Sequence, residues 1–291
     1  MFQLPTVLQK IENDLTRKNN IHLFIKRDDL IHPEISGNKW RKLKYNFEYA
    51  KQNKLNTILT LGGAFSNHIT ATAKACEVLG FKSIGIIRGE EYLPLNKSLQ
   101  FAKDCGMQLF YLDRENYKTK TLTAQINNEI DFNSNDIYII PEGGANSLAT
   151  KGCAEIVDEI DIDFDYIACA CGTGTTLAGI ANNLQAHQKA IGFPVLKNGA
   201  LLYDEIRIFS TNDVHLATDY HFGGYAKSTP KLLQFIKDFY TKHNILLDYV
   251  YTGKMLYGIF DLIEKNYFPE NSTIITIHTG GVMTANVFEL K

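Results

Sequence analysis

The chain has 291 residues, of which 45% are hydrophobic, so it can form one large or two modest domains with a substantial core. Its formal net charge of −2 gives no electrostatic case for binding nucleic acid or an anionic membrane surface. The N-terminal stretch MFQLPTVLQKIEND lacks the cationic start and apolar centre of a signal peptide, and no apolar run reaches membrane-spanning length. We therefore expect a cytoplasmic protein with neither nucleic-acid nor membrane partners.

The first informative segment is 37–42, Gly-Asn-Lys-Trp-Arg-Lys, which follows an extended apolar run. Apolar residues recur at helix spacing from 40 to 50, and Asn38 is a suitable N-cap, so Lys39 is predicted in the first helical turn. There the positive end of the helix dipole and the neighbouring cations disfavour its protonated form. A lysine with a lowered pKa suits Schiff-base chemistry with carbonyl compounds, and a solvated surface lysine is the alternative.

Four short apolar runs have the pattern of buried strands, and each is followed by a glycine-rich turn. The runs span residues 57–61, 137–140, 166–170 and 274–277. Runs that are apolar at nearly every position are typical of parallel strands buried on both faces. Helical patterns between them, at 68–79, 96–105 and 177 to about 187, complete βαβ units. Because ligands bind beyond the carboxyl ends of such strands, we expect the four turns to form one crevice, although glycine after a strand is also ordinary turn chemistry.

The domain division is expected to follow the alternation of elements. Residues 43–134 alternate compactly between strand and helix patterns, and they form the predicted smaller α/β domain. Residues 1–42 together with 135–291 form the predicted larger domain. In the segment 188–224, a short strand-like piece and a turn precede residues that fit a helix and a strand equally well.

The turn at 171–176, Cys-Gly-Thr-Gly-Thr-Thr, is the best predicted anion site. Its glycines lead into a helical pattern with exposed backbone N–H groups, and its three threonines add hydroxyl donors. No lysine follows the last glycine as a P-loop requires, and the glycine spacing does not fit a dinucleotide fingerprint. The turn therefore predicts a site for the single phosphate of a small cofactor.

Ser66 and Asn67 open the helical pattern at 68–79. The G-x-S-x-G pattern of an esterase elbow is absent there. Two interpretations remain open. These residues cap the helix, or their turn binds a carboxylate through its N-terminal amides.

The five cysteines are an odd number without a disulfide-type spacing, which favours a reducing compartment. We expect Cys169 and Cys171 to point to opposite faces of one strand, which argues against a shared metal or redox pair. His215 and His221 lack metal-ligand spacing, so no metal site is predicted. His278 is expected to order its loop rather than to act as a base.

Five motifs occur in order along nearly the whole chain: Gly37-Asn38-Lys39-x-Arg41-Lys42-Leu43, Gly62-Gly63-x-x-Ser66-Asn67-His68, Gly172-Thr173-Gly174-Thr175-Thr176, Val250-Tyr251-Thr252-Gly253-Lys254 and His278-Thr279-Gly280-Gly281. Together they resemble the D-cysteine desulfhydrase and 1-aminocyclopropane-1-carboxylate (ACC) deaminase family. These are fold-type II enzymes of the tryptophan-synthase-β kind that depend on pyridoxal 5′-phosphate (PLP). The resemblance implies an α/β fold with two open, twisted, mostly parallel sheets flanked by helices, an active site in the crevice between the domains, and a homodimer. It is loose between about 185 and 224, where this chain is shorter than the family norm.

The resemblance also implies that the larger domain is the cofactor-binding domain, and it implies which residues bind the cofactor, with Asn67 coming from the smaller domain. Lys39 would form the Schiff base with PLP and later move the Cα proton. Asn67 would hydrogen-bond the ring hydroxyl, and Thr279 would meet the pyridine nitrogen. A hydroxyl there, unlike a carboxylate, does not stabilise a pyridinium, which moderates the electron sink and favours departure of a β-leaving group. The phosphate would lie against Gly172, Thr173, Gly174, Thr175 and Thr176.

For a small amino-acid substrate, the resemblance places Ser66, Asn67 and His68 at the carboxylate. Tyr251 and Tyr225 would flank the reacting atoms as catalytic residues beside Lys39 and Ser66. Thr252 would contribute to the substrate site.

Three positions distinguish the two activities of the family. Thr252, Thr279 and His68 resemble the desulfhydrases, because the deaminases have Glu, Leu and Gln there. Opening a cyclopropane ring needs acid–base help that a threonine does not supply as a carboxylate does. We therefore expect β-elimination from a D-amino acid, D-cysteine above all, which gives pyruvate, ammonia and sulfide. The alternatives are an ACC deaminase that releases 2-oxobutyrate and ammonia, a PLP-binding protein with little or no turnover, which the short 185–224 region motivates, and a generic nucleotide-binding α/β protein.

Overall fold

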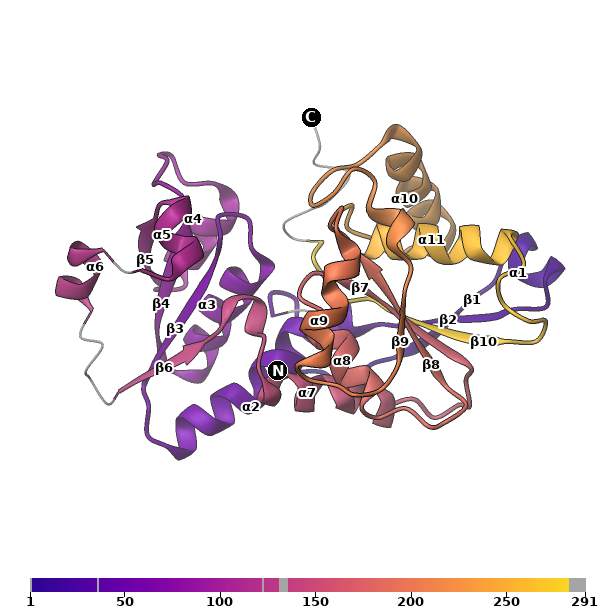
Figure 1. Ribbon diagram of the computed structural model, residues 1–291, viewed down its shortest axis with the longest axis horizontal. Helices are drawn as coiled ribbons and strands as arrows, with labels where there is room; N and C mark the ends of the chain where they lie inside the picture. Colours follow the sequence, from indigo (N-terminus) through magenta and orange to yellow (C-terminus); the bar gives the residue numbers. More distant parts are fainter. Residues whose placement is uncertain (1, 36, 122, 131–135, 283–291) are drawn as a thin grey trace.

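The computed structural model describes residues 2–35, 37–121, 123–130 and 136–282, which form two sheets flanked by helices (Figure 1). Among these residues the larger sheet has six strands in the spatial order β1 (Leu8–Ile11), β2 (His22–Lys26), β10 (Thr273–Ile277), β7 (Tyr166–Cys171), β8 (Lys189–Pro194) and β9 (Val214–Leu216). The smaller sheet has the order β5 (Gln108–Leu112), β4 (Lys82–Arg88), β3 (Thr57–Gly63) and β6 (Ile137–Ile140). Strand β1 is antiparallel to β2, and the other pairs are parallel. The predicted fold class is confirmed.

Helices cover both faces of the larger sheet. The residues of β7 alternate between two apolar cores, so that all six are buried, as expected for a parallel strand between two layers of helices. One core takes side chains from α10 (Pro230–His243), α11 (Thr252–Glu264) and the short α1 (Asp14–Lys18). The other takes them from α7 (Ser147–Asp158), α8 (Thr175–Ala181) and α9 (Leu202–Arg207).

The helix that carries Lys39 joins the two halves of the molecule. This helix, α2 (Asn38–Gln52), packs against α7 of the larger sheet and against α3 (Asn67–Leu79) of the smaller one. The smaller sheet is also flanked by α4 (Lys97–Asp104), α5 (Arg114–Thr119) and α6 (Ala124–Glu129) (Figure 1).

Some boundaries differ from those expected. Asn38 is the first residue of α2 rather than its N-cap. Gly37 takes the cap position with φ of 66°, and a Cβ there would lie 2.0 Å from the carbonyl oxygen of Thr279, so the close approach of the backbone after β10 requires a glycine. Helix α8 ends at Ala181, short of the expected residue 187.

Strand β6 pairs with β3 in the smaller sheet, although the boundary expected at residue 135 assigned it to the larger domain. The rest of the domain division stays a prediction. The segment 188–224, which was ambiguous, contains β8, the 3₁₀ turn η3 (Gly199–Leu201), α9, β9 and the 3₁₀ turn η4 (Thr218–His221). Every helix in the described parts of the chain is too short or too polar to cross a bilayer.

Candidate active site

A cavity of about 390 Å³ lies at the carboxyl ends of the strands of both sheets. The turns after β3, β6, β7 and β10 all contribute to its wall, together with the start of α2. The four glycine-rich turns of the sequence therefore meet at one crevice, as expected from the parallel order of their strands.

Lys39 lies in the first turn of α2, lines this cavity and is partly buried. Burial, followed by the charge of Lys42, lowers the pKa of Lys39 to about 7. The amine is then neutral at a much lower pH than a free lysine, and the neutral form is the nucleophile. A solvated surface lysine, the alternative interpretation, does not fit this position.

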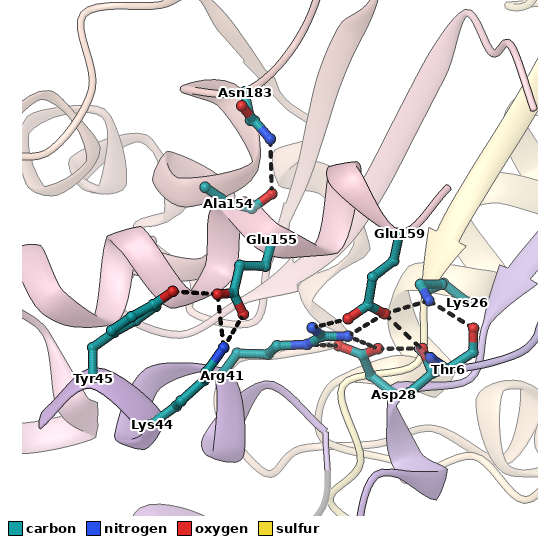
Figure 2. Close-up of polar contacts among 10 residues, drawn as sticks. All are labelled: Thr6, Lys26, Asp28, Arg41, Lys44, Tyr45, Ala154, Glu155, Glu159 and Asn183. Atoms are coloured by element: carbon teal, nitrogen blue, oxygen red, sulfur yellow. Dashed lines mark hydrogen bonds and ion pairs between the residues drawn. The ribbon is translucent and has the colours of Figure 1, made fainter. Parts of the chain in front are cut away.

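A buried network of charges surrounds Arg41, which lies two residues after Lys39 on α2 (Figure 2). Arg41, which is fully buried, donates to both carboxylate oxygens of Asp28 at 2.9 and 3.1 Å and to both of Glu159 at 2.5 and 2.8 Å. Lys26 donates to Glu159 at 2.7 Å, and the hydroxyl of Thr6 donates to Asp28 at 2.7 Å. Each buried charge thus has an oppositely charged partner, which such groups need in a low-dielectric interior.

The same network holds the chain on both sides of Lys39. The backbone carbonyl of Asp28 accepts a hydrogen bond of 2.9 Å from the N–H of Gly37, and its carboxylate binds Arg41. The residues two before and two after Lys39 are therefore tied to one buried aspartate. Arg41 was expected to depress the pKa of Lys39 as a neighbouring cation, but its charge is matched by these carboxylates.

Lys42 connects the start of α2 to the predicted phosphate turn. Its Nζ donates to the carbonyl oxygen of Gly143 at 3.0 Å and to Oγ1 of Thr173 at 3.3 Å. Asn38 donates from its side chain to Oγ1 of Thr176 at 2.8 Å. Burial lowers the pKa of Lys42, which places a second amine with a depressed pKa in the same cavity.

Four of the five residues expected at the phosphate line the cavity, namely Gly172, Thr173, Gly174 and Thr176. Thr175 is fully buried outside the lining, and its Oγ1 lies 3.1 Å from Oγ1 of Thr173. Its hydroxyl contacts the neighbouring threonine, and its assignment to the phosphate stays a prediction.

Ser66 caps α3 and also lines the cavity, so the two interpretations of this residue are compatible. Its Oγ accepts a hydrogen bond of 3.2 Å from the N–H of His68. Asn67, the first residue of α3, lines the cavity beside it. The turn thus presents a hydroxyl and an amide at the helix start, where anions are favoured.

The protonation state of His68 follows from its partners. The hydroxyl of Thr60 donates its single proton to the carbonyl oxygen of Ile140 at 2.8 Å, so its 2.8 Å contact with Nε2 of His68 requires a proton on Nε2. Burial, together with Lys39 and Lys42, lowers the pKa of His68 well below its usual value, and the ring is neutral. Nδ1 then carries a lone pair without a hydrogen-bond partner among the described residues. His68, which lines the cavity, thus has a buried acceptor that no described group uses.

Tyr251 and Tyr225 both line the cavity, with their ring centroids 6.1 Å apart in an edge-to-face arrangement. Thr252, expected in the substrate site, is fully buried and does not line the cavity. Its hydroxyl donates to the carboxylate of Asp248 at 2.6 Å, and the same carboxylate accepts from the N–H of Tyr251 at 2.6 Å. Thr252 thus supports the turn that carries Tyr251.

The last predicted site segment follows β10. Thr279 is buried at the cavity wall. His278 accepts from the N–H of Gly280 at 3.2 Å through Nδ1, so its Nε2 donates to the carbonyl oxygen of Leu246 at 2.8 Å. Both ring nitrogens are occupied by backbone groups, which agrees with the loop-ordering role expected for this histidine.

Cys169 and Cys171 correct one expectation from the sequence. They point to the same face of β7, with their sulfur atoms 4.0 Å apart, because residues two apart in a strand share a face. Both thiols are free and buried. Across the described ranges, no group of three or more His, Cys, Asp and Glu side chains is arranged to hold a metal ion.

The residues at or beside the cavity that were not identified as site residues from the sequence include Lys42, Arg88 and Asp248. Lys42 and Arg88 line it, and Asp248 orders the turn that carries Tyr251. The sequence indicated Lys42 only as a cation close to Lys39. Asp248 lies three positions before Tyr251 and belongs to no recognisable motif. Arg88 is the last residue of β4, and ligands bind at the carboxyl ends of parallel strands. Its place at the end of a predicted strand could therefore have identified it as a site residue.

The chain was compared with known proteins. The family described as pyridoxal-phosphate dependent enzyme matches residues 2–280. The bifunctional D-cysteine desulfhydrase/1-aminocyclopropane-1-carboxylate deaminase of Arabidopsis thaliana, a mitochondrial protein, is 33% identical over 91% of this chain and 73% of its own length. The D-cysteine desulfhydrase of Salmonella typhi is 28% identical over 89% of this chain and 86% of its own. The crystal structure of an ACC deaminase homologue superimposes with a TM-score of 0.81 at 31% identity, covering 97% of this chain and 90% of that one.

Proposed function

Because the chain belongs to the family of pyridoxal-phosphate dependent enzymes, we propose that it is a lyase that releases pyruvate, ammonia and sulfide from D-cysteine or a related β-substituted D-amino acid. The observation that carries this proposal is the position of Lys39, an amine with a pKa of about 7 in the same cavity as a turn rich in threonine hydroxyls. PLP, when bound, supplies the electron sink that makes the Cα proton of an amino acid acidic.

The residues at the cavity fit this cofactor. Lys39 is the amine for the covalent link, and the turn at 172–176 offers hydroxyl groups for the phosphate, with Lys42 contributing positive charge beside Thr173. Asn67 is assigned to the ring hydroxyl and Thr279 to the pyridine nitrogen.

The substrate would lie between the two tyrosines and the start of α3. Ser66, with the backbone amides that follow it, is assigned to the carboxylate, since a helix start favours a negative charge. Lys39 takes the Cα proton, a Cα–Cβ double bond forms, and the thiolate leaves from Cβ with the electrons of the broken carbon–sulfur bond. Water then hydrolyses the released enamine to pyruvate and ammonia. Burial, followed by Tyr225, raises the pKa of Tyr251, so its hydroxyl stays protonated and can donate a hydrogen bond to the departing sulfur.

An ACC deaminase is the second candidate, and the bifunctional name of the Arabidopsis relative favours keeping it. The position of Thr252 weighs less than the sequence suggested, because its side chain does not reach the cavity. The carboxylate of Asp248 is buried close to the cavity. Gly281 lines the cavity, and a Cβ built on it would lie 3.3 Å from Cγ of Asp248 and 3.1 Å from Nδ2 of Asn67. The two reactions are therefore distinguished by measuring their products, pyruvate and 2-oxobutyrate.

The test is a screen of D-cysteine, L-cysteine and ACC with separate quantification of pyruvate and 2-oxobutyrate by chromatography. We expect pyruvate and sulfide from D-cysteine with the PLP-loaded protein and neither product with Lys39→Ala. Lys51→Ala, an exposed lysine in the last turn of the same helix, is the matched control and should keep the wild-type rate. Dominant 2-oxobutyrate from ACC would identify the second candidate. A coloured protein that releases ammonia from none of the three would leave a PLP-binding protein with little turnover.

We also propose that the protein is a cytoplasmic homodimer. The five free cysteines, of which four are buried, support a reducing compartment, and the dimer rests on the family resemblance. Light scattering coupled to gel filtration tests the dimer, and a mass of 32.9 kDa for the particle in solution would refute it.

A further inference from the structure

The segment that precedes Tyr225 lies along one face of α11. The hydroxyl of Tyr220 donates to Asp261 at 2.7 Å, and the ring of Phe222 packs edge-to-face on Tyr257 with centroids 5.0 Å apart. Asp261 and Tyr257 lie seven and three residues after Lys254, so the three side chains share a face of the helix. A segment held at these points runs toward the cavity beside the helix start.

Lys254 makes the last of these contacts before the cavity. Its Nζ donates to the carbonyl oxygens of His221 at 2.9 Å and of Gly224 at 2.8 Å. Only 1% of Lys254 is exposed, and burial lowers its pKa to about 8 although Asp248 acts in the opposite direction. Hydrogen bonds from a charged donor are among the stronger ones, and carbonyl groups enclosed by protein need such partners.

The turn that Lys254 holds has an unusual backbone. Phe222, Gly223 and Gly224 have φ values of 50°, 95° and 116°, a run of positive φ angles that the two glycines adopt readily and that is unfavourable at Phe222. The carbonyl groups on both sides of this run meet at one ammonium group. Lys254 therefore fixes the conformation of the turn, not only its position.

Tyr225 follows this turn directly and lines the cavity, whereas Tyr251 lies at the N-cap of α11, three residues before Lys254. We propose that Lys254 is a positioning residue that clamps the turn 221–224 onto α11 and thereby holds Tyr225 against Tyr251 at the cavity. The clamp is independent of the reaction, but its effect on catalysis rests on the proposed function.

The clamp itself can be tested by limited trypsin digestion of the PLP-loaded protein. Lys227 is exposed two residues beyond Tyr225, and cleavage after it requires local opening of the loop. Removing two charge-assisted hydrogen bonds in Lys254→Met should raise the rate of this cleavage about 10-fold or more, measured as the 1–227 fragment by mass spectrometry. Lys237→Met, on an exposed face of α10, is the matched control and should leave the rate unchanged. An unchanged rate in Lys254→Met would overturn the clamp.

The effect on catalysis is tested by a double-mutant cycle with Tyr225→Phe. If Lys254 acts through Tyr225, kcat falls in each single variant, and the double variant is no slower than the slower single one. The visible absorbance of bound PLP should remain in all three, and Lys254→Arg should recover part of the activity. Multiplicative losses in the double variant would refute positioning of Tyr225.

The outcomes separate this inference from the proposed function. Faster cleavage with wild-type activity in every variant keeps the clamp and rejects the role of Tyr225. If Lys254→Met does not fold, Lys254→Leu, which keeps apolar bulk and also removes the donor to the carbonyl oxygens of His221 and Gly224, takes its place in both measurements. An unchanged cleavage rate in Lys254→Leu then overturns the clamp.

Discussion

Replacing Glu159 with glutamine tests the charge network behind α2, because glutamine keeps the shape of the side chain and removes its charge. The Glu159 side chain is 15% exposed, and its partners Arg41 and Lys26 are fully buried. Burial alone would raise its pKa, but hydrogen bonds from Arg41 and Lys26 outweigh it and lower the pKa from 4.5 to about 2. A lowering of that size is worth about 3 kcal/mol at neutral pH. Loss of one member of a buried pair costs a similar amount, about 3–5 kcal/mol.

We therefore expect Glu159→Gln to lower the free energy of unfolding by about 3 kcal/mol, and the melting temperature by roughly 10 °C. The measurement is urea unfolding, because a neutral denaturant does not screen the charges. A carboxyl group whose pKa is lowered by folding stabilises the protein above its unfolded pKa, and this contribution disappears as the pH falls. The advantage of the wild type should be complete at pH 7 and should shrink between about 4.5 and about 2.

Glu155→Gln is the matched control, since Glu155 lies four residues earlier on α7 and also pairs with a cation of α2 (Figure 2). The side chains of this pair, Glu155 and Lys44, are 24% and 27% exposed, so its loss should cost about 1 kcal/mol or less. If Glu159→Gln is no more destabilising than Glu155→Gln, or if its cost is the same near pH 3 as at pH 7, the reasoning about the buried network is wrong.

Three further predictions concern the cavity. Because the pKa of Lys39 is about 7, the rate of PLP attachment to the apoprotein should rise with pH through about 7 and level off above it. A rate that is independent of pH in this range, measured by stopped-flow absorbance, would contradict the lowered pKa. His68 is neutral in the folded protein, so protonation of this residue in the unfolded chain below pH 6.5 should lower the free energy of unfolding as the pH falls. His68→Gln should abolish that part of the pH dependence. Nitrogen NMR that shows a proton on Nδ1 instead of Nε2 would contradict the assigned tautomer. Thr252→Val leaves the Asp248 carboxylate without its hydroxyl partner and should cost about 1–3 kcal/mol, whereas Thr252→Ser should restore the stability. A change of substrate preference in Thr252→Ser without a change of stability would instead support direct substrate contact.

The sequence predicted the fold and the meeting of its turns because their signals are local and repeated. Buried parallel strands are apolar at nearly every position, and strand order brings their carboxyl ends to one edge. Lys39 was identifiable because it combines a predicted helix start with one of the five ordered motifs. The lowering of its pKa was also expected, although burial and Lys42 cause it rather than the combined cations of the segment.

What the sequence could not show depends on distant contacts. Gly37 replaces Asn38 as the cap because the backbone at Thr279, more than two hundred positions away, occupies the space of a side chain. Thr252 turns toward Asp248 instead of the cavity, and neither residue type indicates this choice. The grouping of Cys169 with Cys171 was, by contrast, within reach of the sequence, since side chains alternate along a strand with a period of two.

The most direct test of the central claim is to locate the covalent link to PLP. The PLP-loaded protein is reduced with borohydride and digested, and the modified lysine is identified by mass spectrometry. Two amines with lowered pKa values, Lys39 and Lys42, line the same cavity, so the experiment discriminates between neighbours. We predict the modification on Lys39, with Lys42 unmodified. Modification of Lys42, or of neither lysine, would contradict the account.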